Sequence, residues 1–199
     1  MKLLHRPDLF GWSAFDAERN LDFHSVLWVR ENGNILIDPL PMSEHDHSHL
    51  QLLGGVNFIV LTNSDHCRDA EHIANNTGAQ IFGPSGEEDT FPIICDRWLH
   101  DNEEIVPGLI AYQLEGSKTH GELALLLEHT TLITGDLIRC HIGGELCMLP
   151  KAKLTDYHKA TQSIKRIADI TGIKTVLTGD GWPIFNHGSE ALHRLARSI

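Results

Sequence analysis

The feature that most constrains the fold is a continuous apolar run at residues 56–61, which has the length of one buried strand. An apolar pattern with helical spacing follows it up to Gly78, and residues 79–82 form the next apolar run. A strand, a helix and a strand in this order predict a β-α-β unit whose two strands are parallel. Such a unit needs helices packed over its sheet, so we expect a mixed α/β fold.

Further strands and helices are expected on both sides of this unit. Residues 23–30 and 35–37 flank the pair Asn32-Gly33, which is a strong hairpin signal. No linker rich in Pro, Gly or Ser divides the chain, so we predict one domain over residues 1–199, with two facing sheets and helices on their outer faces. The remaining expected strands are 109–114, 123–127, 131–134 and 174–177, and the remaining expected helices are 43–53, 155–170 and 189–197.

The charge of the chain limits its partners. The formal net charge of −11 repels phosphate backbones and anionic lipids, so we expect neither nucleic acid nor membrane as a partner. No apolar run approaches the roughly 20 residues of a membrane helix, and the N-terminal stretch is too short for a signal peptide, which predicts a cytoplasmic protein. Cys67, Cys95, Cys140 and Cys147 include no Cys-x-x-Cys pair, and we expect four free thiols.

Five short motifs occur in a fixed order along nearly the whole chain. Together they resemble the landmarks of the metallo-β-lactamase superfamily, and the resemblance implies an αββα sandwich. It does not by itself imply an activity, because one fold carries many functions. The motifs are Leu36-Ile37-Asp38, Leu61-Thr62, Thr119-His120-Gly121-Glu122-Leu123-Ala124-Leu125, Leu132-Ile133-Thr134-Gly135-Asp136 and Gly179-Asp180-Gly181.

The same resemblance implies that the usual two-metal site is dismantled. Relatives carry the loop His-x-His-x-Asp-His and two later histidines. Arg68 lies at one ligand position and cannot bind a metal, because a guanidinium stays protonated and has no free lone pair. Either no metal is bound, or a single Zn, Fe or Mn ion is held by donors among Asp65, His66, Asp136 and Asp180. In this sequence Asn63, Asp65, Cys67 and Arg68 take the loop positions, Lys118 and Asp180 take those of the later histidines, and Asp136 keeps the bridging carboxylate.

A salt-bridge cluster is our hypothesis for what replaces the metals. Asp65, Asp136 and Asp180 would converge with Arg68 and Lys118, since carboxylates in a cleft of low dielectric need positive partners. The sharpest expectation is that Lys118 lies within salt-bridge reach of Asp136 or Asp180. If the cluster is buried, removing the Lys118 charge would cost about 3–5 kcal/mol, whereas an exposed pair would cost about 0–1 kcal/mol.

Several of these residues also have a purely structural interpretation. Asp65 could cap a helix that starts near His66, because Asp is a favoured N-cap residue. Arg68 could pair with Glu71 on an exposed helix face. His66 could pack on the helical face that carries Ile73. Asp136 and Asp180 could serve only to shape Gly-Asp turns.

The tract His45-Asp46-His47-Ser48-His49 imitates a metal motif in its spelling. It precedes the strand that leads into the expected metal loop, so we predict a solvated helix there. His120 and His187 lie close in sequence to Lys118 and Asp180, and either could project into the cleft.

A second hairpin is expected at residues 139–150, around the pair Gly143-Gly144. It would protrude directly after Asp136 and either cover the cleft or contact a second subunit. A solvated surface loop is the alternative.

Two functions are compatible with the sequence, and it leaves open whether the chain is an enzyme. The first is a hydrolase with an altered or single-metal centre, acting on a small ester, thioester, phosphoester or amide. The second is a metal-free binding protein in which Arg68 and Lys118 replace the metal charges and recognise a small anion. A homodimer is compatible with both. The candidate catalytic residues are Asp65, His66, Lys118, Asp136 and Asp180, and the candidate binding residues are Asn63, Arg68 and His120.

Overall fold

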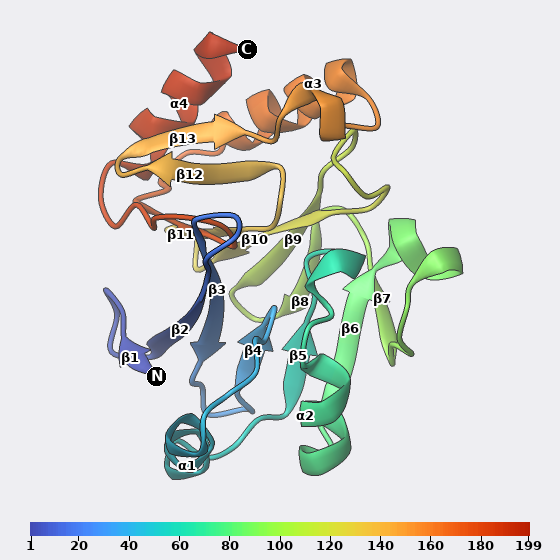
Figure 1. The fold of residues 1–199 in the computed structure, drawn as a ribbon, viewed down its shortest axis with the longest axis vertical. Helices are drawn as coiled ribbons and strands as arrows, with labels where there is room; N and C mark the ends of the chain where they lie inside the picture. The colour runs from blue at the N-terminus through green and yellow to red at the C-terminus, as the bar shows by residue number, and fades with distance from the viewer.

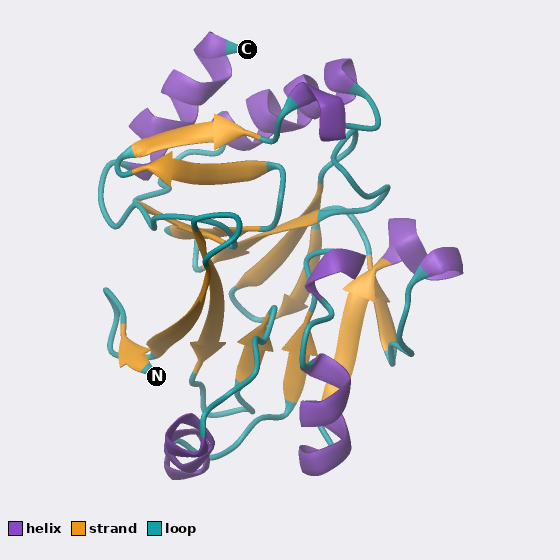
Figure 2. Cartoon of the chain, viewed as in Figure 1, coloured by secondary structure: helices purple, strands orange, loops and turns teal.

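A computed structural model describes residues 1–199 and places two main sheets against each other, with helices on the outside (Figures 1 and 2). The first sheet has seven strands in sequence order, antiparallel from β1 to β4 and parallel from β4 to β7. Helices α1 (Glu44–Leu52) and α2 (Ala70–Thr77) cover its outer face. The strands are β1 (Lys2–Leu3), β2 (Leu9–Asp16), β3 (Leu21–Trp28), β4 (Ile35–Ile37), β5 (Phe58–Val60), β6 (Gln80–Pro84) and β7 (Arg97–Leu99).

The second sheet has five strands in the order β14-β11-β10-β9-β8. Helices α3 (Tyr157–Ala168) and α4 (Gly188–Ser198) pack on its outer face. A separate two-stranded sheet pairs β12 (Ile138–Ile142) with β13 (Glu145–Met148). The five strands are β8 (Glu103–Val106), β9 (Leu109–Gln113), β10 (Leu123–Leu127), β11 (Thr131–Thr134) and β14 (Thr175–Thr178), and short 3-10 turns occur at η1 (Ser64–His66), η2 (Ser85–Thr90) and η3 (Lys151–Lys153).

Burial on both faces explains the apolar runs of the central strands. Alternate residues of β10 face opposite ways, so Leu123 and Leu125 enter the core between the sheets, while Ala124 and Leu126 pack under the outer helices. A strand covered on both sides gains no polar face, so its sequence shows continuous rather than alternating hydrophobicity.

The architecture agrees with the αββα prediction. The expected β-α-β unit is β5, α2 and β6, and its strands pair in parallel. The expected first hairpin is β3 with β4, and the second is β12 with β13, whose turn has Gly144 in the left-handed region at φ +86°. The predictions missed β1, β2, β7 and β8. None of the helices is long and apolar enough to span a membrane.

One edge of the sandwich collects the loops that carry the candidate residues. β5, β11 and β14 all end toward this edge, and β11 is parallel to β14. The two sheets are joined there by backbone hydrogen bonds from Leu123 N to Thr62 O and from His24 N to Gly179 O, 2.7 and 2.9 Å long. Side chains that follow different strands are thereby held close together.

Candidate functional site

His66 is held at the edge of the sandwich by a buried carboxylate. The Asp38 carboxylate follows β4 and accepts hydrogen bonds from the backbone N and Oγ1 of Thr62, at 2.8 and 2.6 Å. Its Oδ2 also lies 2.8 Å from His66 Nδ1. A carboxylate on one ring nitrogen fixes the orientation of a histidine and leaves the other nitrogen free for chemistry. His66 Nε2 accordingly points to Asp136, 3.8 Å from its Oδ1.

Asp38 stays ionised despite its burial. Burial alone would raise the pKa of this carboxyl group. The charge and hydrogen bond of His66, the Arg68 guanidinium and the Thr62 hydroxyl together outweigh burial and hold the pKa below its ordinary value. In the sequence Asp38 and Thr62 are recognisable only as motif residues, and no pattern there indicated their role in positioning His66.

The N-cap of η1 is Asn63, so the alternative interpretation of Asp65 as a helix cap is wrong. Asn63 Oδ1 accepts from the backbone N of His66 at 3.1 Å. The turn begins two residues earlier than the cap interpretation assumed, and Asp65 lies inside it. The Asp65 side chain is therefore free to reach Lys118, with which it forms an ion pair.

Arg68 does not pair with Glu71, and it joins no carboxylate in an ion pair. Its backbone is left-handed, with φ +39°, so its side chain turns away from α2 and back toward β3. There Nη1 donates to the carbonyls of His24 and Asp38, at 2.8 and 3.0 Å. Arg68 thus ties loop backbone together, and its predicted place among the carboxylates is taken by another residue.

That residue is Arg139, which the sequence analysis missed. Its guanidinium, carried by β12, pairs with Asp180 and lies 3.6 Å from Asp136 Oδ1. All three side chains are buried, with 10%, 1% and 7% of their surface exposed for Arg139, Asp180 and Asp136. Asp136 follows β11 and Asp180 follows β14, so the convergence of these two carboxylates agrees with the prediction.

Lys118 approaches the cluster from its exposed side. Besides its ion pair with Asp65, the ammonium lies 4.0 Å from Asp136 Oδ2, as expected. The Lys118 side chain is 44% exposed, however, so the buried ammonium considered in the sequence analysis is absent. The loss of about 3–5 kcal/mol expected for removing the charge of a buried Lys118 therefore does not apply.

Glu122 holds the turn that follows Asp136, a role that the sequence did not predict. Its Oε1 accepts from the backbone N of Leu137 at 2.8 Å, and Ser117 donates to its Oε2. Burial, together with the negative charge of Asp136, raises the pKa of Glu122 to about 8. A protonated Glu122 therefore fixes the turn that presents Asp136 without adding another charge.

A cavity of about 310 Å³ opens over these side chains. His120 and His187 lie outside it: His120 is exposed, and His187 is exposed at the start of α4, where it contacts Glu190. The cavity is lined by Arg19, Phe23, Leu40, Asp65, His66, Arg68, Lys118, Asp136, Arg139, Leu149, Lys153 and Asp180.

The residues present do not fit the two-metal centre that the family resemblance implies. Asn63 caps a turn, Asp65 is half-exposed, and Arg68 is a cation. Cys67 packs against the apolar cluster beneath α1 and α2, where burial raises the pKa of its thiol to about 12. This thiol is a poor source of the thiolate that a metal requires.

A single ion does fit the donors that remain. His66, Asp136 and Asp180 each offer one ligand atom, and these atoms lie within 4.8 Å of one another. Asp136 Oδ2 and Asp180 Oδ1 are buried without a hydrogen bond, whereas Asp180 Oδ2 is ion-paired with Arg139. No other group of three such donors occurs in the chain, and the tract at His45 to His49 forms a largely solvent-facing helix, as predicted.

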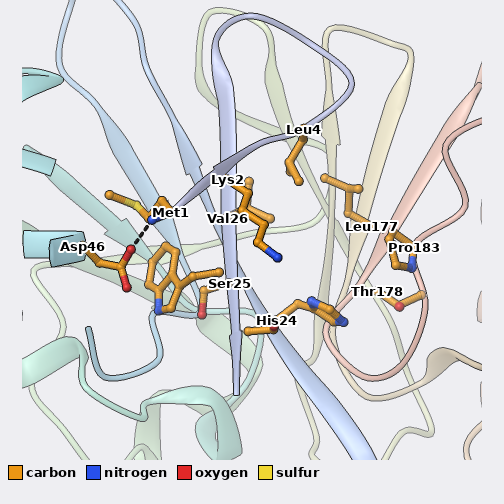
Figure 3. Close-up of a pocket in the computed structure, with 13 residues that line it drawn as sticks. Met1, Lys2, Leu4, His24, Ser25, Val26, Asp46, Leu177, Thr178 and Pro183 are labelled. Carbon is orange, nitrogen blue, oxygen red and sulfur yellow. Dashed lines mark hydrogen bonds and ion pairs between the residues drawn. The ribbon is translucent and has the colours of Figure 1, made fainter. Parts of the chain in front are cut away.

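A second cavity, of about 430 Å³, lies on the other side of β3 (Figure 3). Phe23 and His24 are neighbours on that strand and point to opposite faces, so each lines a different cavity. Figure 3 shows the amino group of Met1 joined to Asp46 at one end of this second cavity. No group of three metal donors lines this second cavity, so the candidate site is the smaller cavity, which His66, Asp136 and Asp180 line.

Comparisons with solved structures agree with this architecture. A metallo-β-lactamase from Erythrobacter litoralis matches with a TM-score of 0.77 and 13% identity, over 99% of this chain and 96% of that one. One from Pontibacter korlensis matches at 0.73 and 15%, over 96% and 97%. FIM-1 from Pseudomonas aeruginosa, in its mono-zinc form, matches at 0.71 and 13%, over 96% and 90%. These identities show the fold alone.

The family is shown by a profile that spans the whole chain. Among curated proteins, a comparison finds none that matches. The profile of the metallo-beta-lactamase superfamily, in contrast, matches residues 1–199. The chain therefore belongs to the metallo-β-lactamase superfamily.

Proposed function

We propose that the protein is a hydrolase of a small anionic substrate, with a centre for one divalent ion formed by His66, Asp136 and Asp180. The observation that carries the proposal is the convergence of these three buried donors within 4.8 Å, where Asp136 Oδ2 and Asp180 Oδ1 accept no hydrogen bond. A single ion has a precedent in the fold, because FIM-1 was solved in a mono-zinc form. Zn, Fe and Mn all accept imidazole and carboxylate ligands.

The side chains around the centre have separable tasks in this proposal. Asp38 orients the His66 ring so that Nε2 faces the cavity. A divalent ion at this position would act as a Lewis acid toward a carbonyl or phosphoryl oxygen. Lys118, held by Asp65, presents an ammonium at the open side of the cavity, where a substrate anion would approach. Ester, thioester, phosphoester and amide bonds all suit this arrangement.

A metal-free binding protein is the second candidate, and the position of Arg139 favours it. The Arg139 guanidinium already contacts both carboxylates of the cluster. In this version Arg139 and Lys118 replace the metal charges, and Arg68 does not, because it bonds to backbone carbonyls. The cavity would then bind a small anion without hydrolysing it.

Elemental analysis separates the two candidates. The protein is purified without a His tag and without added metal, and its melting temperature is measured with and without chelator. The hydrolase proposal expects about one metal equivalent per chain and a lower melting temperature in chelator. A metal-free protein whose melting temperature does not change with chelator or with added zinc would support the binding protein instead.

Two matched variants identify the metal position. Asp180→Asn removes a donor of the cluster and should abolish retention of the metal. Asp65→Asn changes a half-exposed residue outside the donor set and should retain it. Equal metal content in both variants would contradict the assigned ligands.

The cellular location, the oligomeric state and the role of the second hairpin stay predictions. We keep a cytoplasmic location and a small-molecule partner. Arg139 and Leu149, both at the base of the β12–β13 hairpin, line the cavity, whereas Gly144 at its turn accepts a hydrogen bond from Arg194 of α4, so only the base of the hairpin adjoins the cavity. Solution scattering of a hairpin-shortened variant tests the dimer, because an unchanged mass would argue against an interface there.

A further inference from the structure

The cavity concentrates positive charge in an acidic protein. The chain carries a formal charge of −11. Five cationic side chains line the cavity against three carboxylates, which leaves an excess of two positive charges. Clefts of one sign focus the electrostatic field and attract ligands of the opposite sign. The five cations are Arg19, Arg68, Lys118, Arg139 and Lys153, and the three carboxylates are Asp65, Asp136 and Asp180.

Two of these cations form no ion pair with the carboxylates that line the cavity and no hydrogen bond with its loops. Lys118 and Arg139 pair with its carboxylates, and Arg68 bonds to backbone carbonyls. Arg19, in the turn between β2 and β3, is 70% exposed, and its one ion pair is with Asp16, at 3.6 Å and outside the cavity lining. Lys153, at the end of η3, is exposed and forms no ion pair. The two cations that do not bond to the cluster or its loops therefore come from two separate elements at the cavity wall.

The Phe23 ring contacts Arg19, one of these two cations. The guanidinium of Arg19 lies 5.7 Å from the centre of the Phe23 ring, and that of Arg68 lies 5.6 Å from the same ring. Cation–π contact of this kind orients a guanidinium without using its N–H donors. Arg19 therefore keeps its planar set of donors for a carboxylate or phosphate, which it can bind with two parallel hydrogen bonds.

We infer that the ligand of this cavity is a small dianion, either a phosphate monoester or a dicarboxylate, with one anionic group held between Arg19 and Lys153. Two negative charges match Arg19 and Lys153, the two cations of the lining that bond neither to its carboxylates nor to loop carbonyls. That the group to be hydrolysed lies over His66, Asp136 and Asp180 rests on the proposed function. The recognition of the dianion does not, because Arg19 and Lys153 lie outside the proposed metal ligands.

Calorimetric titration tests the inference on the protein as purified, and again in chelator. The probes are inorganic phosphate, succinate and acetate at constant ionic strength, because exposed charges are screened by salt. Phosphate or succinate should bind in both conditions, and whichever binds more tightly identifies the source of the charge. Acetate should bind at least about tenfold more weakly, since it lacks the second charge.

Variants locate the binding groups. Arg19→Ala and Lys153→Ala should each weaken dianion binding by about tenfold, which is the usual loss for one charge-assisted contact. Lys151→Ala is the matched control, because Lys151 lies in the same short η3 turn but contacts the Tyr157 ring, 4.6 Å from its centre, and does not line the cavity. It should leave binding unchanged.

The failures of the two proposals are distinguishable. A protein that purifies without metal and takes up no added zinc, but still binds the dianion, would sink the one-metal hydrolase and leave this inference intact. The inference is overturned if acetate binds as well as succinate and phosphate, or if Arg19→Ala and Lys153→Ala bind like the control. Binding that disappears in chelator would likewise overturn it, because it would place the anion on the metal rather than between Arg19 and Lys153.

Discussion

Replacing Arg139 with leucine tests whether this side chain compensates the buried carboxylates. The substitution keeps an apolar stem on β12 and removes the only buried cation that contacts both Asp136 and Asp180. Asp180 is 1% exposed and Asp136 is 7% exposed, so neither carboxylate can recover its lost partner from water. Breaking a buried ion pair from one side costs about 3–5 kcal/mol, and we expect Arg139→Leu to lose a free energy of unfolding in this range.

Added zinc should restore part of that loss. With the guanidinium removed, an ion that binds only the native state, at a free concentration of about 100 times its Kd, stabilises that state by about 2.7 kcal/mol. Urea unfolding at neutral pH, with zinc or with chelator, measures both effects. Arg166→Leu is the control, because Arg166 pairs with Asp101 at the surface and its loss should cost about 0–1 kcal/mol. A loss below about 1 kcal/mol for Arg139→Leu would refute the reasoning.

Three further predictions concern the support of the cluster. Lys118→Met should cost only about 0–1 kcal/mol in urea unfolding, because its side chain is 44% exposed, and a loss near that of Arg139→Leu would contradict this. Glu122 keeps its proton up to about pH 8 when folded but releases it near 4.5 when unfolded, so stability should fall between these pH values. Glu122→Gln should flatten that decline, and an unchanged pH profile of unfolding would count against the raised pKa. Gly116→Ala should lose about 1–3 kcal/mol in thermal melts, because φ is +79° and a Cβ would lie 2.2 Å from a backbone oxygen of residue 156. Gly143→Ala, in open space, should change stability by less than about 0.5 kcal/mol.

Local sequence patterns predicted the elements whose burial is uniform. The β5–α2–β6 unit and β10 were found because each is apolar along its length or at helical spacing. β2 was missed because its burial decreases from Leu9 toward Asp16, so its outer half shows no regular alternation. Pattern analysis detects a strand through its contacts with the core, and much of β2 has few.

The sequence predicted only those residues of the candidate site that lie in recognisable motifs. Asp136 and Asp180 follow strands in a recognisable order, and their convergence was foreseen. Arg139 was missed because its contact with Asp180 depends on how β12 turns across the end of β14, which no spacing in the sequence encodes. The side chain of Arg68 was misplaced because its backbone is left-handed, a conformation that only Gly, Asn and Asp signal in a sequence.

A crystal structure of the protein grown with zinc, with anomalous scattering data collected at the zinc edge, tests the central claim most directly. We expect one anomalous peak per chain, bonded to His66 Nε2 and to the carboxylates of Asp136 and Asp180, with the guanidinium of Arg139 displaced from its present contact. Two peaks, or an empty cluster with Arg139 still paired to Asp180, would contradict the one-metal centre.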